Sequence, residues 1–204
     1  MSLRIGYGFD SHAFKEGVPL VIGGMLIPHT QGLAGHSDGD VLLHAITDAL
    51  LGAVSAGDIG TFFPPSDPRW KGAASSLFLR TALEEIHTAG YRIVNVDTVL
   101  VMAQPKIVPI AGELRESVAE LLGVKPGDVG IKAKTPEGLN LDHVAVAHAT
   151  VLLESLDLSN GDKMMVATAD VDEVNEVVES LVTGVRDTSA LGRKMPTFDT
   201  DDLT

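Results

Sequence analysis

The chain has 204 residues, of which 45% are hydrophobic and only 4% aromatic, and its formal net charge is −13. This acidic balance argues against a nucleic-acid-binding protein, because phosphate contacts need clustered Lys and Arg. The chain contains no cysteine, which excludes disulfides, a thiolate nucleophile and cysteine-ligated zinc, so any metal must be held by His and carboxylates.

Size and hydropathy predict one hydrophobic core with an appended segment. No stretch approaches the ~20 apolar residues of a membrane span, and the first residues lack the basic start and apolar run of a signal peptide. We therefore expect a cytoplasmic protein without membrane contacts.

The first elements are a short strand over 3–9 and a hairpin over 18–28 that turns at Gly23-Gly24. From residue 37 apolar residues recur at helical spacing. Ser37 or Asp38 is the expected N-cap of this helix, which should end between residues 52 and 57.

Residues 58–72 contain three prolines and no sustained periodicity, which predicts a long loop. The pattern then predicts helices over 75–88 and 109–122, a strand over 91–102, and a closing pair of strands at 129–134 and 144–153. The expected fold is α/β, a layered domain of α+β type with a mixed sheet on one side and helices on the other.

The composition changes after Glu154. We expect a folded domain over 1–154 and an acidic C-terminal extension over 155–204. The extension should hold one helix at about 170–182, where valines and a leucine share a face, and a disordered end.

Candidate metal ligands lie near the N-terminus. Asp10 and His12 are two residues apart, so an extended backbone projects both side chains from one face. This suits two ligands of one ion, and the alternative is a solvated strand end. His44 lies in an apolar helix, where a histidine is either satisfied in the core or used as a ligand.

Acidic residues surround the start of the same helix. Asp40, His44 and Asp48 are four apart and share a helix face. The alternative is that Ser37 and Asp38 cap the helix, while Asp40 and Asp48 favour its dipole and its surface.

Together, Asp10, His12 and His44 would leave one tetrahedral position of a zinc ion open, as in catalytic zinc sites. Such an ion could polarise a phosphoryl oxygen. A helix N-terminus at Ser37 would add N–H donors for phosphate.

Two loops carry further candidates. Asp58 and the Pro-rich segment after it could close over a sugar-like substrate, although a surface connection fits equally well. The turn at 132–138 contains Thr135 and Glu137, which suit a diphosphate and Mg²⁺. Such turns are commonly only solvated.

Several motifs follow one another along the first 153 residues: G-F-D-x-H (8–12), H-S-D-G-D-V-x-x-H-A-x-x-D-A-L-L-G (36–52), G-D-I-G (57–60), F-P-x-x-D-P-x-x-K-G (63–72), G-Y-x-x-x-N-x-D (90–97), P-K (105–106), K-x-K-T-x-E-G (132–138) and A-H-A-x-V-L-L (147–153). In order and spacing they resemble the 2-C-methyl-D-erythritol 2,4-cyclodiphosphate synthase family of the non-mevalonate isoprenoid pathway.

The resemblance implies a homotrimer with active sites between neighbouring subunits. The substrate would be 4-diphosphocytidyl-2-C-methyl-D-erythritol 2-phosphate, a cytidine diphosphate ester. Its 2-phosphate would attack its own β-phosphate, release CMP and close the cyclic diphosphate, which is a phosphorus–oxygen lyase reaction.

The resemblance also assigns roles by matched position. The expected metal ligands are Asp10, His12 and His44 for Zn²⁺ or another divalent transition metal, and Glu137 for Mg²⁺ or Mn²⁺. His36 and Thr135 would be catalytic, by holding the reacting phosphates. Substrate contacts are expected from Ser37, Asp58, Ile59, Gly60, Asp67 and Lys134, and nucleotide contacts from Met102, Ala103, Gln104, Pro105, Lys106, Ile107 and Val108.

Three departures from the family pattern stand out. Pro65 replaces an expected carboxylate, and Pro136 removes a backbone N–H from the diphosphate loop. A G-R-G-E segment expected after Gly138 is absent, so prenyl diphosphate binding in a central channel has no support.

Two other functions compete with the synthase. One is a non-catalytic trimer that binds metal and cytidine nucleotide as a sensor or scaffold, and the other is a zinc-dependent hydrolase of another cytidine diphosphate ester. The intact set of both metal sites favours the synthase.

Overall fold

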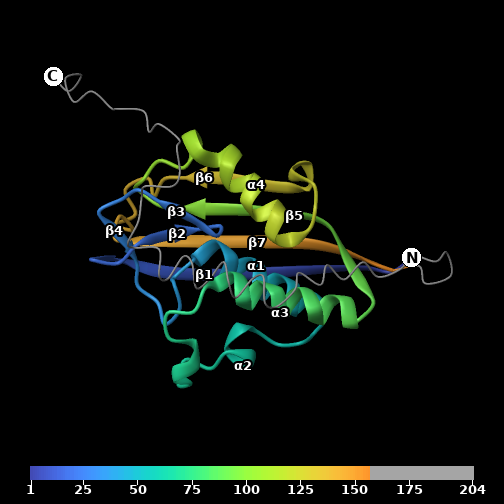
Figure 1. Cartoon of the computed structure of the whole chain (residues 1–204). Coiled ribbons are helices and arrows are strands. Elements are labelled where there is room, and N and C mark those ends of the chain that lie inside the picture. Colours follow the sequence, from blue (N-terminus) through green and yellow to red (C-terminus); the bar gives the residue numbers. More distant parts are fainter. Residues whose placement is uncertain (157–204) are drawn as a thin grey trace, which may run out of the picture. The chain divides into compact units, whose positions relative to one another are not determined.

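The computed structural model describes residues 1–156 (Figure 1). The predicted helix at about 170–182 and the predicted disordered end lie outside these residues. Within the described part of the chain, no helix has both the length and the apolarity needed to cross a membrane.

The main sheet has five strands in the order β4-β1-β7-β5-β6 (Figure 1). Only β5 and β6 pair in parallel, and the other neighbours are antiparallel, which confirms a mixed sheet. The strands are β1 (Leu3–Glu16), β4 (Gln31–Leu33), β5 (Tyr91–Val101), β6 (Val129–Lys134) and β7 (Val144–Ser155).

Two expectations about the strands are wrong. β6 and β7 do not pair with each other, because the connection from β5 to β6 runs through a helix and such a crossover joins parallel neighbours. β7 therefore lies on the other side of β5. β1 is also longer than the predicted 3–9, since its second half continues along β7 and reaches β4 at Phe14.

Three long helices cover one side of the sheet (Figure 1): α1 (Val41–Ala53), α3 (Ser75–Thr88) and α4 (Ala111–Leu122). α3 has the predicted bounds. The predicted cap of α1 is wrong, because the helix begins at Val41 and its N-cap is Asp40 rather than Ser37 or Asp38.

Shorter elements complete the described chain. The predicted hairpin is confirmed as β2 (Leu20–Ile22) and β3 (Met25–Ile27), which pair across Gly23-Gly24. The segment predicted as one long loop contains two short helices, because Asp58 and Asp67 cap them. The short helices of the chain are α2 (Ile59–Phe62), η1 (Pro68–Trp70), η2 (Val108–Ile110) and η3 (Pro126–Asp128).

Helix α1 lies directly on the backbone of β1. A methyl group at Gly6 would lie 1.8 Å from the carbonyl oxygen of Ala49, and one at Gly8 would lie 1.9 Å from that of Ala45. Only glycine permits this approach. The contact brings the first turn of α1 beside the middle of β1, where two of the candidate ligands lie.

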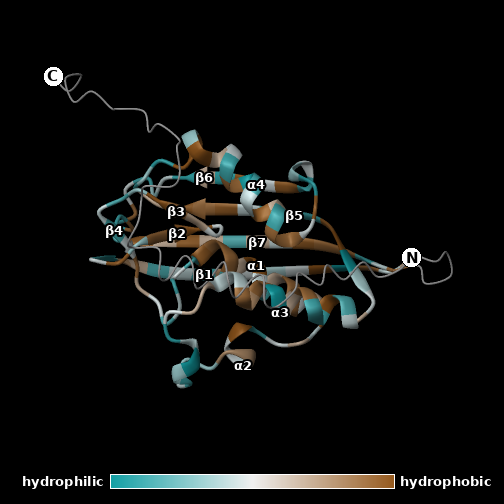
Figure 2. Cartoon of the chain, in the orientation of Figure 1, coloured by the Kyte–Doolittle hydropathy of each residue, from teal (hydrophilic) through white to brown (hydrophobic). Residues whose placement is uncertain are grey.

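The opposite side of β1 is open. Side chains alternate along a strand, and four large apolar residues of β1 point away from α1, with exposures of 53, 72, 61 and 50% for Leu3, Ile5, Tyr7 and Phe9. Figure 2 shows that apolar residues also make up much of β5, which is separated from β1 by β7. Among residues 1–156, these apolar side chains on the open face of β1 are therefore left exposed.

Candidate metal centre

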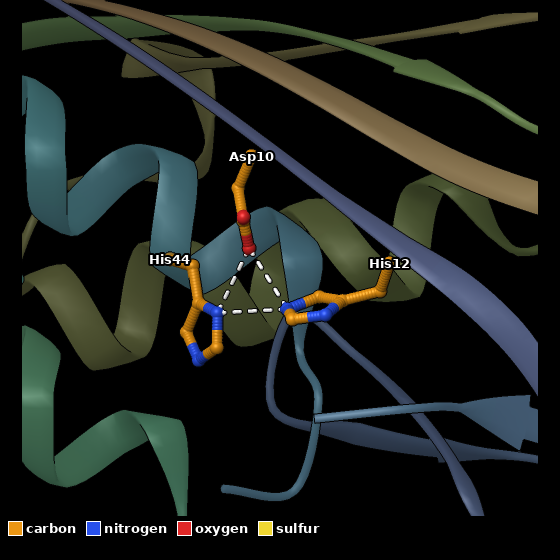
Figure 3. Close-up of side chains that lie close together, drawn as sticks. All are labelled: Asp10, His12 and His44. Carbon is orange, nitrogen blue, oxygen red and sulfur yellow. Dashed lines mark hydrogen bonds and ion pairs between the residues drawn. The ribbon is translucent and has the colours of Figure 1, made fainter. Parts of the chain in front are cut away.

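Asp10, His12 and His44 converge on one point between β1 and α1 (Figure 3). Asp10 Oδ2 lies 2.9 Å from His12 Nε2 and 2.8 Å from His44 Nδ1, and the two ring nitrogens are 3.1 Å apart. The structure thus brings together the three residues that the sequence predicted as ligands of one ion.

The fold explains this convergence. Asp10 and His12 alternate to the side of β1 that faces the helices, in the same row as Gly6 and Gly8. His44 is in the first turn of α1, where its backbone N–H bonds to Asp40. The side chains of Asp10, His12 and His44 are 26, 17 and 11% exposed, so the cluster opens to solvent on one side.

The cluster is electrostatically coupled. Burial raises the pKa of Asp10, but hydrogen bonds and charge from His12 and His44 outweigh burial and hold this pKa well below its usual range. Burial lowers the pKa of His12, yet Asp10 raises it above the ordinary value. A cation is therefore favoured at the point where these groups meet.

The geometry fits a tetrahedral metal ion. Ligand atoms at about 2.1 Å from a zinc ion lie about 3.4 Å apart in a tetrahedron. The three distances observed here, 2.8, 2.9 and 3.1 Å, are a few tenths shorter. A slight opening of the cluster would admit the ion and leave a fourth position toward solvent.

The outer nitrogen of His44 has partners that the sequence did not reveal. His44 Nε2 lies 2.8 Å from Ser75 Oγ and 3.0 Å from Ser37 Oγ. Ser75 in turn hydrogen-bonds to Asp38 through both its backbone N–H and its hydroxyl. The only local signal for Ser75 was that it is a polar residue at the first position of a helix. Such a residue indicates helix capping and not a contact with His44.

Asp40 has a structural role rather than a place at the metal. Its side chain has no exposed surface. It accepts backbone N–H bonds from the hairpin turn and from the first turn of α1, donated by Gly23, Gly24, Leu42 and Leu43 at 2.7–3.1 Å. The expectation that Asp40 shares a helix face with His44 and Asp48 is wrong, because the helix starts after it. For the same reason Ser37 does not lie at a helix N-terminus.

His36 and Asp67 lie near each other beside this cluster. His36 Nε2 is 3.3 Å from the backbone oxygen of Asp67. The Asp67 carboxylate, predicted to contact substrate, caps η1 and pairs with Arg69 at 2.6 Å. Backbone bonds from Gly72 to His36 and from Asp38 to Ala73 tie the two loops together.

Helix α2 starts with Ile59 and Gly60, and its N-cap residue is Asp58. The Asp58 carboxylate accepts bonds of 2.8 Å from both the N–H and the hydroxyl of Thr61, which lower its pKa. The N–H of Ile59 bonds to Asp48 at 2.8 Å. Asp48 lies one turn after His44, so α1 positions this loop as well as the metal ligand.

The remaining predicted residues lie at the other edge of the sheet. Thr135 and Glu137 hydrogen-bond to each other just after β6, and the N–H of Met102 bonds to Lys134 at 3.1 Å. The segment 102–108 follows β5, so both groups share one end of the sheet. β1 and β6 are separated by β7 and β5, which places them about 14 Å apart.

The chain is thus a layered α/β domain with a candidate metal site of two imidazoles and a carboxylate at a helix–sheet junction. The model of the YgbB family matches residues 3–154. The chain belongs to the YgbB family.

Several similar proteins are cyclodiphosphate synthases by name. A 2-C-methyl-D-erythritol 2,4-cyclodiphosphate synthase of Koribacter versatilis is 68% identical over 152 residues, which cover 74% of this chain and 98% of the relative. That of Aquifex aeolicus is 50% identical over 153 residues, covering 75% and 98%. A solved structure of such a synthase superposes with a TM-score of 0.71 at 46% identity, covering 74% of this chain and all of the other. A CDP-bound form gives 0.70 at 44% identity, with the same coverage.

Proposed function

We propose that this chain is a 2-C-methyl-D-erythritol 2,4-cyclodiphosphate synthase, a phosphorus–oxygen lyase of isoprenoid precursor synthesis. An oxygen of the substrate 2-phosphate bonds to the β-phosphorus, and the bond from this phosphorus to the bridging oxygen breaks. CMP leaves with that oxygen. The convergence of Asp10, His12 and His44 carries the proposal, since the phosphoryl transfer needs positioning and charge neutralisation rather than a side-chain nucleophile.

Two ions are proposed. Asp10, His12 and His44 would hold Zn²⁺ or another divalent transition metal, and Glu137 would hold Mg²⁺ or Mn²⁺. Bound ions of this kind polarise phosphoryl oxygens and neutralise developing charge. One carboxylate beside a hydroxyl suits Mg²⁺, which commonly binds one or two carboxylates together with substrate phosphates.

The other residues position the substrate. His36 and Thr135 are proposed to hold the reacting phosphates. Ser37, Asp67, Lys134 and the start of α2 (Asp58, Ile59 and Gly60) would contact the methylerythritol part, and the segment 102–108 would line the cytidine pocket. The exposed carboxylate of Asp58 suits the hydroxyl groups of a sugar alcohol.

The active site is proposed to form between subunits of a homotrimer. The strand that carries Asp10 and His12 (β1) and the strand that precedes Glu137 (β6) lie about 14 Å apart in the sheet of one chain, which is much longer than a diphosphate group. A neighbouring subunit would therefore supply the Glu137 half to the Asp10 half. The exposed apolar residues of β1, Leu3 to Phe9, support a second copy on the open sheet face.

This assembly predicts a mass in solution of three times 21.4 kDa. Replacing Ile5, which is 72% exposed, by Arg should yield monomers, because an unpaired charge cannot be buried in an interface without a large cost. Analytical ultracentrifugation would measure both masses. A monomeric wild type, or a trimer of unchanged affinity in Ile5→Arg, would contradict this arrangement.

Turnover is tested with purified protein, the cytidine diphosphate substrate, Zn²⁺ and Mg²⁺. We expect stoichiometric CMP and cyclic diphosphate, measured by chromatography and ³¹P NMR. CMP with a linear product would identify a hydrolase, and nucleotide binding without CMP would identify a sensor or scaffold. Either result would overturn the synthase.

A further inference from the structure

On the side away from Asp10 and His12, the proposed metal ligand His44 contacts a hydrogen-bonded pair made of the buried Ser75 and the partly buried Asp38. Ser75 has no exposed surface, and its hydroxyl lies 2.8 Å from His44 Nε2, the nitrogen that faces away from Asp10 and His12. The pair joins the loop before α1 to the start of α3, 37 residues later.

The chemistry of the groups fixes the direction of these hydrogen bonds. A carboxylate only accepts, so both the backbone N–H and the hydroxyl of Ser75 donate to Asp38. The single hydroxyl hydrogen of Ser75 is then used in the bond to Asp38, so the Ser75 oxygen can only accept a hydrogen bond from His44. His44 therefore donates from Nε2.

This direction selects the tautomer of His44. A neutral imidazole carries one N–H, so while Nε2 donates to Ser75, an ion can take the place of the hydrogen that Nδ1 would otherwise donate to Asp10. Nδ1 is the atom that lies 2.8 Å from Asp10 Oδ2 and 3.1 Å from His12 Nε2. Histidine ligands of metals usually donate their second N–H to such a partner, which fixes the ring and its tautomer.

We propose that Asp38 and Ser75 are positioning residues of the metal centre, which hold His44 with Nδ1 free to bind the ion. Ser37 also lies 3.0 Å from His44 Nε2, but it is partly exposed and no carboxylate fixes its hydroxyl. The Ser37 hydroxyl therefore remains available to a ligand, while the Ser75 hydroxyl accepts the hydrogen bond from the imidazole of His44. This inference rests on the proposed metal centre and not on the reaction catalysed.

Asp38 also caps α3, because the N-cap residue of this helix, Ala74, makes no side-chain hydrogen bond. The test must therefore distinguish the loss of this cap from the loss of the positioning role. Asp38→Asn keeps the bond that caps α3 but gives up the 3.2 Å bond that Asp38 Oδ1 accepts from the Asp40 N–H, so Ser75→Ala, which removes the hydroxyl alone, completes the separation. The amide oxygen can still accept the Ser75 N–H, whereas the amide NH₂ donates to the Ser75 hydroxyl. The hydroxyl then donates to His44 Nε2, and the ring proton moves to Nδ1, which can no longer bind the ion.

The test measures the Zn²⁺ affinity of the full chain by competition with a chromogenic chelator. We expect Asp38→Asn to weaken binding about 10–100-fold and Ser75→Ala about 10-fold, as for other partners of metal-bound histidines. Ser117→Ala is the matched control, because its hydroxyl donates to Gly23 at 2.7 Å, away from His44. The control should keep the wild-type affinity.

A second measurement needs no substitution. In ¹⁵N-histidine-labelled, zinc-loaded wild type, NMR should show His44 with a proton on Nε2 and metal on Nδ1. Metal on Nε2, or wild-type Zn²⁺ affinity in both Asp38→Asn and Ser75→Ala, would overturn the positioning role. A wild type without any Zn²⁺ affinity would overturn it together with the metal centre, whereas zinc binding without CMP release would contradict the proposed reaction alone.

Discussion

Replacing His44 by alanine is expected to remove the transition metal and to lower the rate of CMP release by about 10³-fold or more, since metal polarisation of a phosphoryl oxygen is worth several kcal/mol. Asp10 and His12 remain, but two ligands on one strand cannot enclose the ion. Metal content by inductively coupled plasma mass spectrometry and CMP release by chromatography measure the two effects.

The proposed trimer should stay intact in His44→Ala, because His44 lies on the helix side of the sheet and not on its open face. His87→Ala is a suitable control, since His87 lies in the last turn of α3 and outside the cluster. An unchanged zinc content in His44→Ala would rule out the ligand assignment, even if turnover fell.

Replacing Gly8 by alanine is expected to lower the free energy of unfolding by on the order of 4 kcal/mol, above the usual cost of overpacking. The added methyl group would lie 1.9 Å from the carbonyl oxygen of Ala45 and 2.7 Å from the amide nitrogen of Ala49. These are backbone atoms, so no side-chain rotation relieves the clash and α1 must move away from β1. His44 would move with it, and Zn²⁺ affinity should fall as well.

Gly52→Ala provides the matched control on the same helix, because nothing lies within 4 Å of the added methyl group. Alanine favours a helix over glycine by up to about 1 kcal/mol, so this variant should be as stable as wild type or more stable. Urea unfolding at one fixed protein concentration compares the three chains. If the urea midpoint of unfolding of Gly8→Ala equalled that of the wild type, the result would contradict the close backbone contact.

Much of the candidate site was predictable because its signals are local. Asp10 and His12 follow strand alternation, and His44 is a polar residue in an apolar helical pattern, so their meeting required only that the helix pack on the strand. The signals for the bounds of α3 were also local, since the helix starts at a polar residue and Gly90 follows its end.

Most of the mistaken expectations depend on distant partners. Ser37, Asp38 and Asp40 are each good N-cap residues, and the choice of Asp40 is made by the amides of Gly23 and Gly24 in a separate hairpin. The position of β6 depends on which strand it reaches after α4. The role of Ser75 depends on Asp38 and His44, neither of which is near it in the sequence.

The aspartates around α1 have different roles, which follow from how deeply each side chain is buried. Asp40 is fully buried and lies outside the candidate metal cluster, yet as N-cap it fixes where α1 begins, and His44 follows in the first turn of that helix. A residue that touches no reacting group should therefore still influence activity, because the position of an imidazole in the candidate site depends on it.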